Sequence, residues 1–346
     1  MKIVHIFWGL GTGGIETMLV NIANEQVKLG HKVYIIIIND LVNEMLRNRL
    51  SSDVCFICLG RKLKSKSPWF VVSLNLCLMR IAPDVIHSHK CEIKKIILPL
   101  WQKRCVLTVH DVLRSSFNKD YSWYKKVYAI SDSVRDDLKR IQGIDVKTIF
   151  NGISIEVFRQ RKERKDIVNI VQVSRITHEK KGQDILLKAF ANLVNEGYNT
   201  LTLTFVGEGE SESFLKNMAN ELGVADCVHF AGLWQQDYLF EHLADFDLFV
   251  QPSRYEGFGL TVAEAIAAKV PVLVSANQGP MEIIDQGKYG YSFANDDVND
   301  CTNKLRSIVQ NGCDLEMMNK GYYFICQNFD VCETARKYIE EYKRIF

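Results

Sequence analysis

The chain has 346 residues, enough for two domains that each bury a core, and its composition is that of an ordinary water-soluble globular protein. No apolar run approaches the ~20 residues that a membrane-spanning helix needs, so no transmembrane helix is predicted. The net charge is only +2, but residues 1–150 carry 23 Lys and Arg against 13 Asp and Glu, whereas the remainder carries 20 against 28.

Strand-like and helix-like segments alternate along the chain. Short apolar runs predict a first set of strands, at residues 2–7, 32–38, 54–59, 84–87, 106–109, 126–130 and 146–149. A charged stretch at residues 159–166 interrupts the pattern. A second set of strands then follows, at residues 168–173, 202–206, 227–230, 247–250 and 272–274. Such alternation is typical of parallel sheets with helices on both faces, so we expect two doubly wound α/β domains with ligands beyond the carboxyl ends of the strands.

A glycine-rich turn follows the first predicted strand. Gly9, Gly11 and Gly14 match the spacing G-x-G-x-x-G, and Asp40 ends the second predicted strand, where a dinucleotide-binding domain keeps the acid for its ribose. This pattern predicts an NAD-dependent oxidoreductase as one alternative. A single match is weak evidence, because tight strand-to-helix turns select glycine for packing alone.

The sequence EGFGLTVAE, at residues 256–264, lies where a buried strand turns into a helix. Gly257 and Gly259 permit close approach to the first amides of that helix, which have no intrahelical partner and favour an anion such as phosphate. Glu256 and Glu264 flank this position and suit hydroxyl groups better than phosphate. A phosphate site between two hydroxyl acceptors suggests a nucleotide sugar. A solvated acidic helix start explains this stretch alone equally well.

Two cations are predicted at the same edge of the second sheet. Arg175 follows the first strand of the second set, and Lys181 precedes the next helix. An arginine can grip a diphosphate with its planar fork, and a lysine can act as a point charge. Such residues are usually solvated surface charges. Their coincidence with the turn at residues 257–259 nevertheless favours a diphosphate site.

Motifs distributed over the chain carry a resemblance to a known family. They are GGIETMLVNIANEQVKLGHKV at residues 13–33, PDVIHSH at 83–89, LTVHD at 107–111, AISDSV at 129–134, FNGI at 150–153, VSRITHEKKGQDILLKAF at 173–190, FVGEGE at 205–210 and PSRYEGFGLTVAEAIAAKVPVLVS at 252–275. Together they resemble the family 4 glycosyltransferases, retaining enzymes of the GT-B fold, and EGFGLTVAE matches the E-x7-E motif of that family. The resemblance runs nearly end to end.

The resemblance implies two Rossmann-like domains that face a cleft. Residues 1–155 with 328–346 would form the acceptor-side domain, and residues 156–327 would bind the nucleotide sugar. The C-terminal segment, a helical pattern with Tyr338, Tyr342 and Phe346 at regular spacing, would return to the first domain.

The resemblance also implies roles for the matching residues. Arg175 and Lys181 would bind the diphosphate of the donor and stabilise the leaving nucleotide. Glu256 would contact hydroxyls of the transferred sugar, and Glu264 would hold the ribose hydroxyls. The backbone amides that would meet sugar or phosphate oxygens are those of Phe258, Gly259 and Leu260. From the first domain, His110 would reach the donor sugar, and the diphosphate and the acceptor would be bordered by Gly13 and Gly14.

Two positions depart from the family pattern. The glycine-rich turn near the end of the donor domain is replaced by NQGPME at residues 277–282, which is expected to alter the acceptor side of the cleft. Thr17 stands where the family often has arginine, a change of little expected consequence.

The implied reaction is transfer of a hexose or N-acetylhexosamine from a UDP- or GDP-sugar to a glycan or polyprenyl-linked glycan, as in assembly of bacterial capsule or lipopolysaccharide. Front-face substitution would retain the configuration, with a diphosphate oxygen taking the proton of the acceptor. No metal is expected, and Asp245 and Asp247 are interpreted as structural. His87 and His89 lie near a strand end with no third ligand in view. Besides the oxidoreductase, an inactive glycosyltransferase-like partner subunit remains an alternative.

Cations and aromatic residues cluster twice in the basic half, as RKLKSKSPWF at residues 61–70 and YSWYKK at residues 121–126. Lysines near anionic lipid contribute about 1 kcal/mol each, and Trp and Tyr favour the interface. These clusters predict a cytoplasmic protein that rests peripherally on the inner face of the membrane. The alternative is a solvated basic loop together with ordinary core aromatic residues. The ten scattered cysteines favour a reducing compartment. Nucleic acid is not an expected partner, because no reading motif is present.

Overall fold

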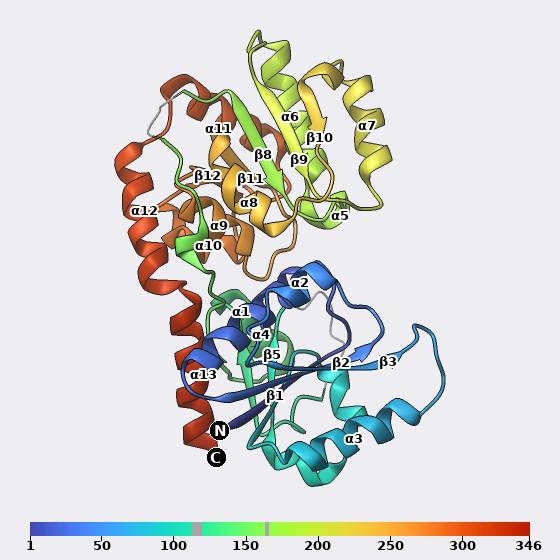
Figure 1. Cartoon of the computed structure of the whole chain (residues 1–346). Coiled ribbons are helices and arrows are strands. Elements are labelled where there is room, and N and C mark those ends of the chain that lie inside the picture. The colour runs from blue at the N-terminus through green and yellow to red at the C-terminus, as the bar shows by residue number, and fades with distance from the viewer. Residues whose placement is uncertain (113–119, 163–165) are drawn as a thin grey trace. The chain divides into compact units, whose positions relative to one another are not determined.

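The computed structural model describes residues 1–112, 120–162 and 166–346 (Figure 1). The chain divides into two compact units. Unit 1 comprises Met1–Ser154 and Phe329–Phe346, and unit 2 comprises Ile155–Asn328. The boundaries expected from the sequence differ from these by one residue at each junction. The charged stretch at residues 159–166 lies inside unit 2, and its residues 163–165 are outside the described part.

Unit 1 contains a parallel sheet with the strand order β3-β2-β1-β4-β5-β6-β7. Its strands are β1 (Lys2–Phe7), β2 (Lys32–Asn39), β3 (Cys55–Arg61), β4 (Val85–Ser88), β5 (Cys105–Val109), β6 (Lys126–Ala129) and β7 (Lys147–Thr148). Its α-helices are α1 (Gly14–Lys28), α2 (Glu44–Asn48), α3 (Trp69–Ile81), α4 (Asp132–Gln142) and α13 (Val331–Ile345). Two 3-10 helices are η1 (Cys91–Ile96) and η2 (Pro99–Arg104). The central strands are nearly continuous apolar runs because helices cover both faces of such sheets.

Local signals in the sequence explain where the helices of unit 1 begin and end. The hydroxyl of Ser131 accepts a hydrogen bond from the amide of Val134 and so caps the start of α4, and Gly143 ends that helix with a φ of +66°. Glu16 and Lys28 lie in the first and last turns of α1, where their charges oppose the helix dipole.

The C-terminal helix returns to unit 1, as predicted. Helix α13 packs against α1 (Figure 1), and Tyr338 and Tyr342 are completely buried. The hydroxyl of Thr334 donates to the carbonyl of Phe150 over 2.9 Å. By contrast, 46% of Phe346 is exposed, so the third aromatic residue of the predicted pattern does not contribute to this packing.

Unit 2 contains a second parallel sheet with the strand order β10-β9-β8-β11-β12-β13. Its strands are β8 (Asn169–Val173), β9 (Thr202–Val206), β10 (Val228–Phe230), β11 (Leu248–Gln251), β12 (Val272–Ser275) and β13 (Tyr291–Phe293). Its α-helices are α5 (His178–Lys181), α6 (Gln183–Asn195), α7 (Glu212–Glu221), α8 (Gln236–His242), α9 (Leu260–Ala267), α10 (Pro280–Ile283), α11 (Val298–Asn311) and α12 (Leu315–Asn328). Its 3-10 helices are η3 (Ile155–Val157), η4 (Ala225–Cys227), η5 (Leu243–Asp245) and η6 (Asp285–Gly287).

Each predicted strand corresponds to a strand of the structure, and one short edge strand, β13, was not predicted. The predicted doubly wound α/β architecture is therefore confirmed in both units. Among the described helices, none is both long enough and apolar enough to span a lipid bilayer.

Candidate active site

The turn between β11 and α9 is shaped by glycines. Gly259 precedes α9 and has a φ of +97°, a left-handed conformation that other residues rarely adopt. A Cβ atom built on Gly279 would lie 2.5 Å from the backbone of Gly257, so this neighbouring turn also requires glycine. The first amides of α9 have no partner within the helix. These features give the start of α9 the properties of an anion-binding position.

Lys181 and Glu256 form an ion pair at this edge of the sheet. The Nζ atom of Lys181 donates to Oε2 of Glu256 over 2.5 Å, and only 18% and 16% of the two side chains are exposed. Gln251, at the end of β11, donates its side-chain amide to the same oxygen over 3.3 Å. Two donors therefore fix the position of the Glu256 carboxylate.

The backbone next to Lys181 packs directly on the loop that follows β11. Gly182 has a φ of +67°, and a Cβ atom built on it would lie 1.9 Å from the carbonyl oxygen of Pro252. The amide of Arg254 donates to the carbonyl of Lys180 over 3.0 Å. Only glycine permits this contact, which brings the end of α5 against the EGFG turn although about 75 residues separate them in the sequence.

Arg254 braces this arrangement, and the sequence did not single it out. Its guanidinium binds both carboxylate oxygens of Asp184 over 2.8 and 2.9 Å, and it also donates to the carbonyl of His178 and to Asp296. Burial raises the pKa of Asp184, but the hydrogen bonds and charge of Arg254 outweigh this and lower the pKa below its ordinary value. The planar fork of Arg254 therefore ties the loop after β11 to α6.

The NQGPME turn holds Glu256 as well. The side-chain oxygen of Gln278 accepts from the amide of Glu256 over 2.9 Å, and the amide of Gly279 donates to the carbonyl of Glu256 over 3.0 Å. Asn277 has a φ of +59°, in the left-handed region that asparagine tolerates. The departure from the family pattern thus supplies two hydrogen bonds to a predicted site residue.

Arg175 lies beyond the end of β8, with its side chain exposed to solvent. Its carbonyl accepts from the side chain of Gln183 over 2.9 Å. Cβ atoms built on Gly207 and Gly209 would lie 2.1 Å from the carbonyl oxygens of Ser174 and Ile176, on either side of Arg175. The glycines of the GEGE motif therefore serve close backbone packing, which positions the loop that carries Arg175.

The other predicted residues of unit 2 lie on or beside α9. Phe258 is buried, with 2% exposed, so only its backbone could face a ligand. Leu260 is the first residue of α9, and Glu264 lies one turn further along with 7% exposed. A carboxylate buried to this extent requires polar partners.

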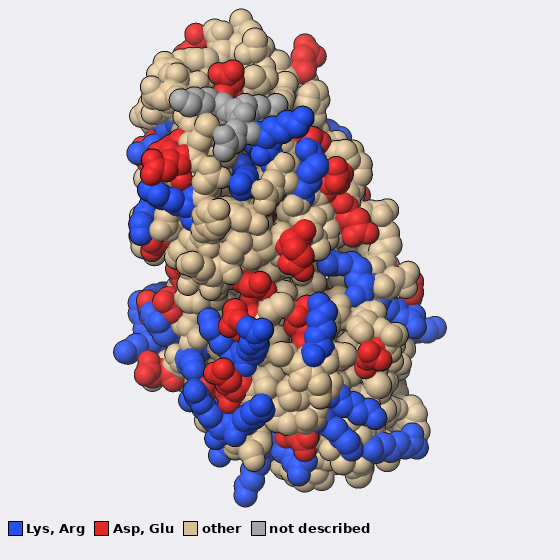
Figure 2. Space-filling view, turned by 60° about the vertical axis from the view of Figure 1, so that its left-hand side comes forward, with Lys and Arg blue, Asp and Glu red and all other residues tan. Residues whose placement is uncertain are grey.

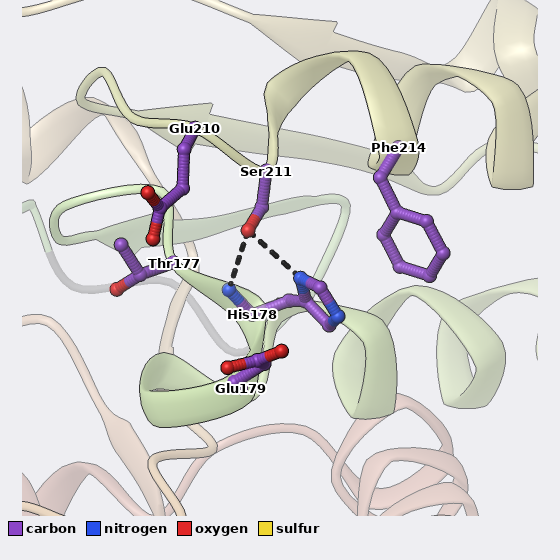
Figure 3. A pocket seen from close by; sticks show the side chains of 6 residues that line it. All are labelled: Thr177, His178, Glu179, Glu210, Ser211 and Phe214. Carbon is purple, nitrogen blue, oxygen red and sulfur yellow. Dashed lines mark hydrogen bonds between the residues drawn. The ribbon is translucent and has the colours of Figure 1, made fainter.

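A small pocket of about 240 Å³ lies beside this edge of unit 2 (Figure 3). It is lined by Thr177, His178, Glu179, Glu210, Ser211 and Phe214. The hydroxyl of Ser211 contacts the backbone amide of His178 over 3.1 Å and its Nδ1 over 2.8 Å, and Phe214 stacks on the imidazole with ring centres 4.3 Å apart. None of the lining residues was predicted as a site residue.

Asp245 and Asp247 have structural partners, as expected. Asp247 is buried, binds Arg161 over 3.1 Å, and accepts from the amides of Val168 and Asn169. Asp245 pairs with Arg159 and His242. These carboxylates join the start of β8 to the residues that precede β11.

In unit 1, Gly13 and Gly14 form the start of α1. Gly13 precedes the helix with an extended φ of −88°, and Gly14 is its first residue. A Cβ atom built on Gly13 would lie 2.5 Å from Oε2 of Glu16. The Glu16 carboxylate therefore lies beside Gly13 at the start of α1. Asp40 is exposed after β2. The strand order of this sheet suits both a dinucleotide-binding domain and the acceptor-side domain that the family resemblance implies.

His110 follows β5, is partly exposed, and contacts a group of buried histidines. Its Nε2 lies 3.0 Å from Nδ1 of His89, whose Nε2 lies 3.0 Å from Nδ1 of His5. Burial, and to a lesser extent the charge of Lys90, lowers the pKa of His110 to about 3, and burial lowers the pKa of His5 to about 4. The expectation that His87 and His89 have no third neighbour was wrong, because His5 places a ring nitrogen within 4.8 Å of theirs.

Known proteins match both halves of the chain. The family model described as Glycosyltransferase Family 4 matches residues 12–157, and the model described as Glycosyl transferases group 1 matches residues 154–323. Protein CapJ of Staphylococcus aureus is 33% identical over 145 residues, which are 42% of this chain and 37% of CapJ. Glycogen synthase of Mycobacterium tuberculosis is 27% identical over 251 residues, which are 66% of this chain and 60% of the synthase. The matches thus span less than two thirds of the length of either relative.

A solved structure matches the whole chain. Anabaena Alr3699/HepE in complex with UDP and glucose has a TM-score of 0.81 at 19% identity, with 99% of each chain covered. At this identity the likeness shows the fold alone, and that fold is GT-B.

Proposed function

The chain belongs to the glycosyltransferases described by the family 4 and group 1 models, and on this basis we propose that it transfers a sugar from a nucleoside diphosphate sugar to a glycan acceptor. The observation that carries the proposal is the partly buried ion pair of Lys181 and Glu256 beside the glycine turn that precedes α9. A cation, a hydroxyl acceptor and the start of a helix at one sheet edge suit the diphosphate and the sugar of such a donor.

The residues of this edge have complementary roles in the proposed reaction. Cleavage of a glycosyl–phosphate bond develops positive charge on the sugar and negative charge on the diphosphate. Arg175, Lys181 and the amides of residues 258–260 would stabilise the leaving diphosphate. Glu256 would accept hydrogen bonds from hydroxyls of the transferred sugar, and Glu264 would accept hydrogen bonds from the ribose hydroxyls. From unit 1, we propose that His110 contacts the donor sugar and that Gly13 and Gly14 border the diphosphate.

The proposed reaction retains the anomeric configuration and needs no metal ion. Double displacement requires a carboxylate nucleophile, but Glu256 is paired with Lys181 and assigned to sugar hydroxyls. Front-face substitution instead lets a diphosphate oxygen take the proton of the acceptor. The protein cations Arg175 and Lys181 supply the charge that a metal would otherwise supply.

We propose a UDP- or GDP-sugar as the donor, carrying a hexose or an N-acetylhexosamine. The complex of Alr3699/HepE with UDP and glucose makes UDP the first nucleotide to test. The proposed acceptor is a glycan or polyprenyl-linked glycan of a bacterial surface polysaccharide.

The surface of α3 supports a lipid-linked acceptor. Four apolar side chains spaced along one stripe of this helix are exposed, namely Trp69, Val72, Leu76 and Met79. The loop before the helix exposes Leu63 with the basic residues Lys62, Lys64 and Lys66. Figure 2 shows many Lys and Arg side chains on one face of the molecule, with Asp and Glu side chains among them. An apolar stripe beside cations fits an anionic membrane surface, so we propose that the protein binds one peripherally on its cytoplasmic side.

The second predicted cluster, at residues 121–126, does not contribute its tyrosines to such a surface. Tyr121 and Tyr124 are 3% and 5% exposed, and the hydroxyl of Tyr124 donates to the carbonyl of Cys91 over 2.9 Å. Both rings are therefore part of the core, and the hydroxyl of Tyr124 finds its partner inside unit 1. The proposed membrane surface is therefore limited to residues 61–79.

A panel of UDP- and GDP-sugars, offered with membrane-extracted acceptors, tests the proposed function. We expect release of the nucleoside diphosphate and formation of a glycosylated product with one donor. A thermal shift with UDP but not with NAD would favour the glycosyltransferase over the oxidoreductase, and the reverse result would reject it.

A further inference from the structure

A line of hydrogen-bonded imidazoles runs through the buried end of the sheet in unit 1. His5 on β1 lies opposite His87 of β4 in the strand pairing, His89 follows β4, and His110 follows β5. The contacts from His110 to His89 and from His89 to His5 are each 3.0 Å. At the far end, Nε2 of His5 lies 2.8 Å from Oε1 of Gln26 on α1. Both Gln26 and His5 are fully buried.

Gln26 determines where the protons of this line reside. An amide oxygen can only accept, so His5 must donate to it from Nε2. A neutral imidazole has one N–H group, which leaves Nδ1 of His5 as the acceptor for an Nε2 proton from His89. Because His89 carries its proton on Nε2, its Nδ1 is an acceptor, and the proton between His89 and His110 belongs to Nε2 of His110. Its Nδ1 is then left with a bare lone pair.

That nitrogen has no hydrogen-bond partner. Nδ1 of His110 is buried and unpaired within the part of the chain that the structure describes. A buried acceptor without a donor is costly, and a ligand hydroxyl is the kind of donor that would satisfy it. Sugar substrates present several hydroxyls.

We propose that Gln26, His5 and His89 are positioning residues that fix the tautomer of His110, so that its Nδ1 accepts a hydrogen bond from a hydroxyl of the sugar substrate. The inference rests on the proposed function, because that function supplies the sugar. It assigns a task to the imidazole ring of His110 and to three residues to which the family resemblance gave no role.

The geometry favours a hydrogen-bonded line over a metal centre. Nitrogen ligands at the usual zinc distance of about 2.0–2.1 Å are about 3.3 Å apart in a tetrahedral site, whereas His5 and His89 are 3.0 Å apart. His87 is already engaged at both nitrogens, since Nε2 lies 2.7 Å from the hydroxyl of Thr108 and Nδ1 lies 2.6 Å from that of Tyr342. A metal would have to displace these hydrogen bonds.

Long-range proton–nitrogen NMR of the full-length, histidine-labelled protein tests the tautomer directly. Single His→Gln variants assign the signals, and the exposed His229 serves as the internal reference. For His110, His89 and His5 we expect the same pattern. The nitrogen chemical shift of Nδ1 should be that of an unprotonated nitrogen, and the shift of Nε2 should be that of a protonated nitrogen. A protonated Nδ1 in His110 would overturn the inference. So would displacement of the His5 and His89 signals by one equivalent of zinc.

Two substitutions at Gln26 separate positioning from simple packing. In Gln26→Glu an ionised carboxylate oxygen still accepts from Nε2 of His5, so in the pH range where His5 stays neutral the tautomer of His110 and kcat/KM should stay close to wild type. In Gln26→Leu no acceptor remains, so the signals of His110 should average between tautomers and kcat/KM should fall about three- to tenfold, the loss of one neutral hydrogen bond. Equal loss in both variants with an unchanged tautomer would overturn the proposal.

The NMR measurement and the activity assay together distinguish failure of this inference from failure of the proposed function. The NMR measurement reads the tautomer in the wild-type protein and needs no substrate. An active transferase with protonated Nδ1 in His110 refutes the inference alone. A protein with bare Nδ1 that transfers no sugar refutes the proposed function and, with it, the sugar hydroxyl as the ligand of His110.

Discussion

The ammonium group of Lys181 lies 2.5 Å from a carboxylate oxygen of Glu256, and the pair is largely buried at the carboxyl edge of the second sheet. Lys181 ends α5, whereas Glu256 follows β11, so the pair exists only because Gly182 lets the two loops touch. A donor that binds here would exchange one ion pair for two contacts, Lys181 with phosphate and Glu256 with sugar hydroxyls. Loss of either partner leaves the other charge poorly compensated.

Lys181→Ala, Glu256→Ala and Arg175→Ala should each lower kcat about 10²–10³-fold, because each would remove a preorganised contact at the proposed reacting centre. The exposed Lys188 on α6 provides a matched control, and Lys188→Ala should keep wild-type rates. Circular dichroism should show that all four variants are folded. Near-normal turnover in the three site variants would contradict the assignment of the site.

Unfolding should depend on pH through the buried histidines. The pKa of His5 is about 4 in the folded protein and 6.5 as the ordinary value, so the unfolded chain binds the extra proton first as the pH falls. The stability associated with neutral His5 is present above pH 6.5 and is lost progressively as the pH falls toward 4. At pH 5 protonation linked to His5 lowers the free energy of unfolding by about 2 kcal/mol relative to neutral pH.

Urea denaturation at pH 7 and pH 5 measures this effect. The non-titrating variant His5→Gln should lose less free energy of unfolding between the two pH values than wild type does. His229→Gln, at an exposed histidine, should behave like wild type. Identical pH dependence in wild type and His5→Gln would show that His5 is protonated or solvated in the folded state.

Removal of residues 332–346 should give insoluble protein. Tyr338 and Tyr342 are completely buried, and their hydroxyls contact Thr108 and His87 over 3.0 and 2.6 Å. Truncation would expose apolar surface of α1 and leave buried polar groups unpaired. The measurement is the soluble fraction after expression and size-exclusion chromatography. A soluble and fully active truncated protein would contradict the role given to α13.

Sedimentation with liposomes should show binding that rises with anionic lipid and weakens with salt. Replacing Lys62, Lys64 and Lys66 by Glu should abolish most of this binding, since each lysine contributes about 1 kcal/mol near the surface. The control variant replaces the exposed Lys125 and Lys126 by Glu, and it should still bind the vesicles. These two lysines lie in the cluster whose tyrosines are buried. Equal binding to neutral and anionic vesicles would reject the proposed membrane surface.

The sequence predicted most of the secondary structure because buried parallel strands are short apolar runs that stand out from the helices between them. The strand β13 was not predicted, because its sequence YSF is only three residues long and lies at the edge of the sheet. The residues of the Lys181–Glu256 pair were predicted to share one sheet edge because the carboxyl ends of parallel strands meet there.

Other contacts could not be predicted, because they depend on packing between segments far apart in the sequence. Nothing near Arg254 indicates that its partner is Asp184, 70 residues earlier. His5 and His110 lie on or after different strands, and only the strand order brings both to His89. Tyr121 has the same composition signal as an interfacial tyrosine, although it is buried.

The measurement that decides between transfer and the alternatives is a donor panel read out by both nucleotide release and product NMR. Wild type should release UDP or GDP from one nucleotide sugar, form a glycoside with the anomeric configuration of the donor, and do so in the presence of a chelator. Glu256→Gln should lose this activity. No release from any nucleotide sugar with membrane-extracted acceptors, or a product of inverted configuration, would contradict a retaining glycosyltransferase.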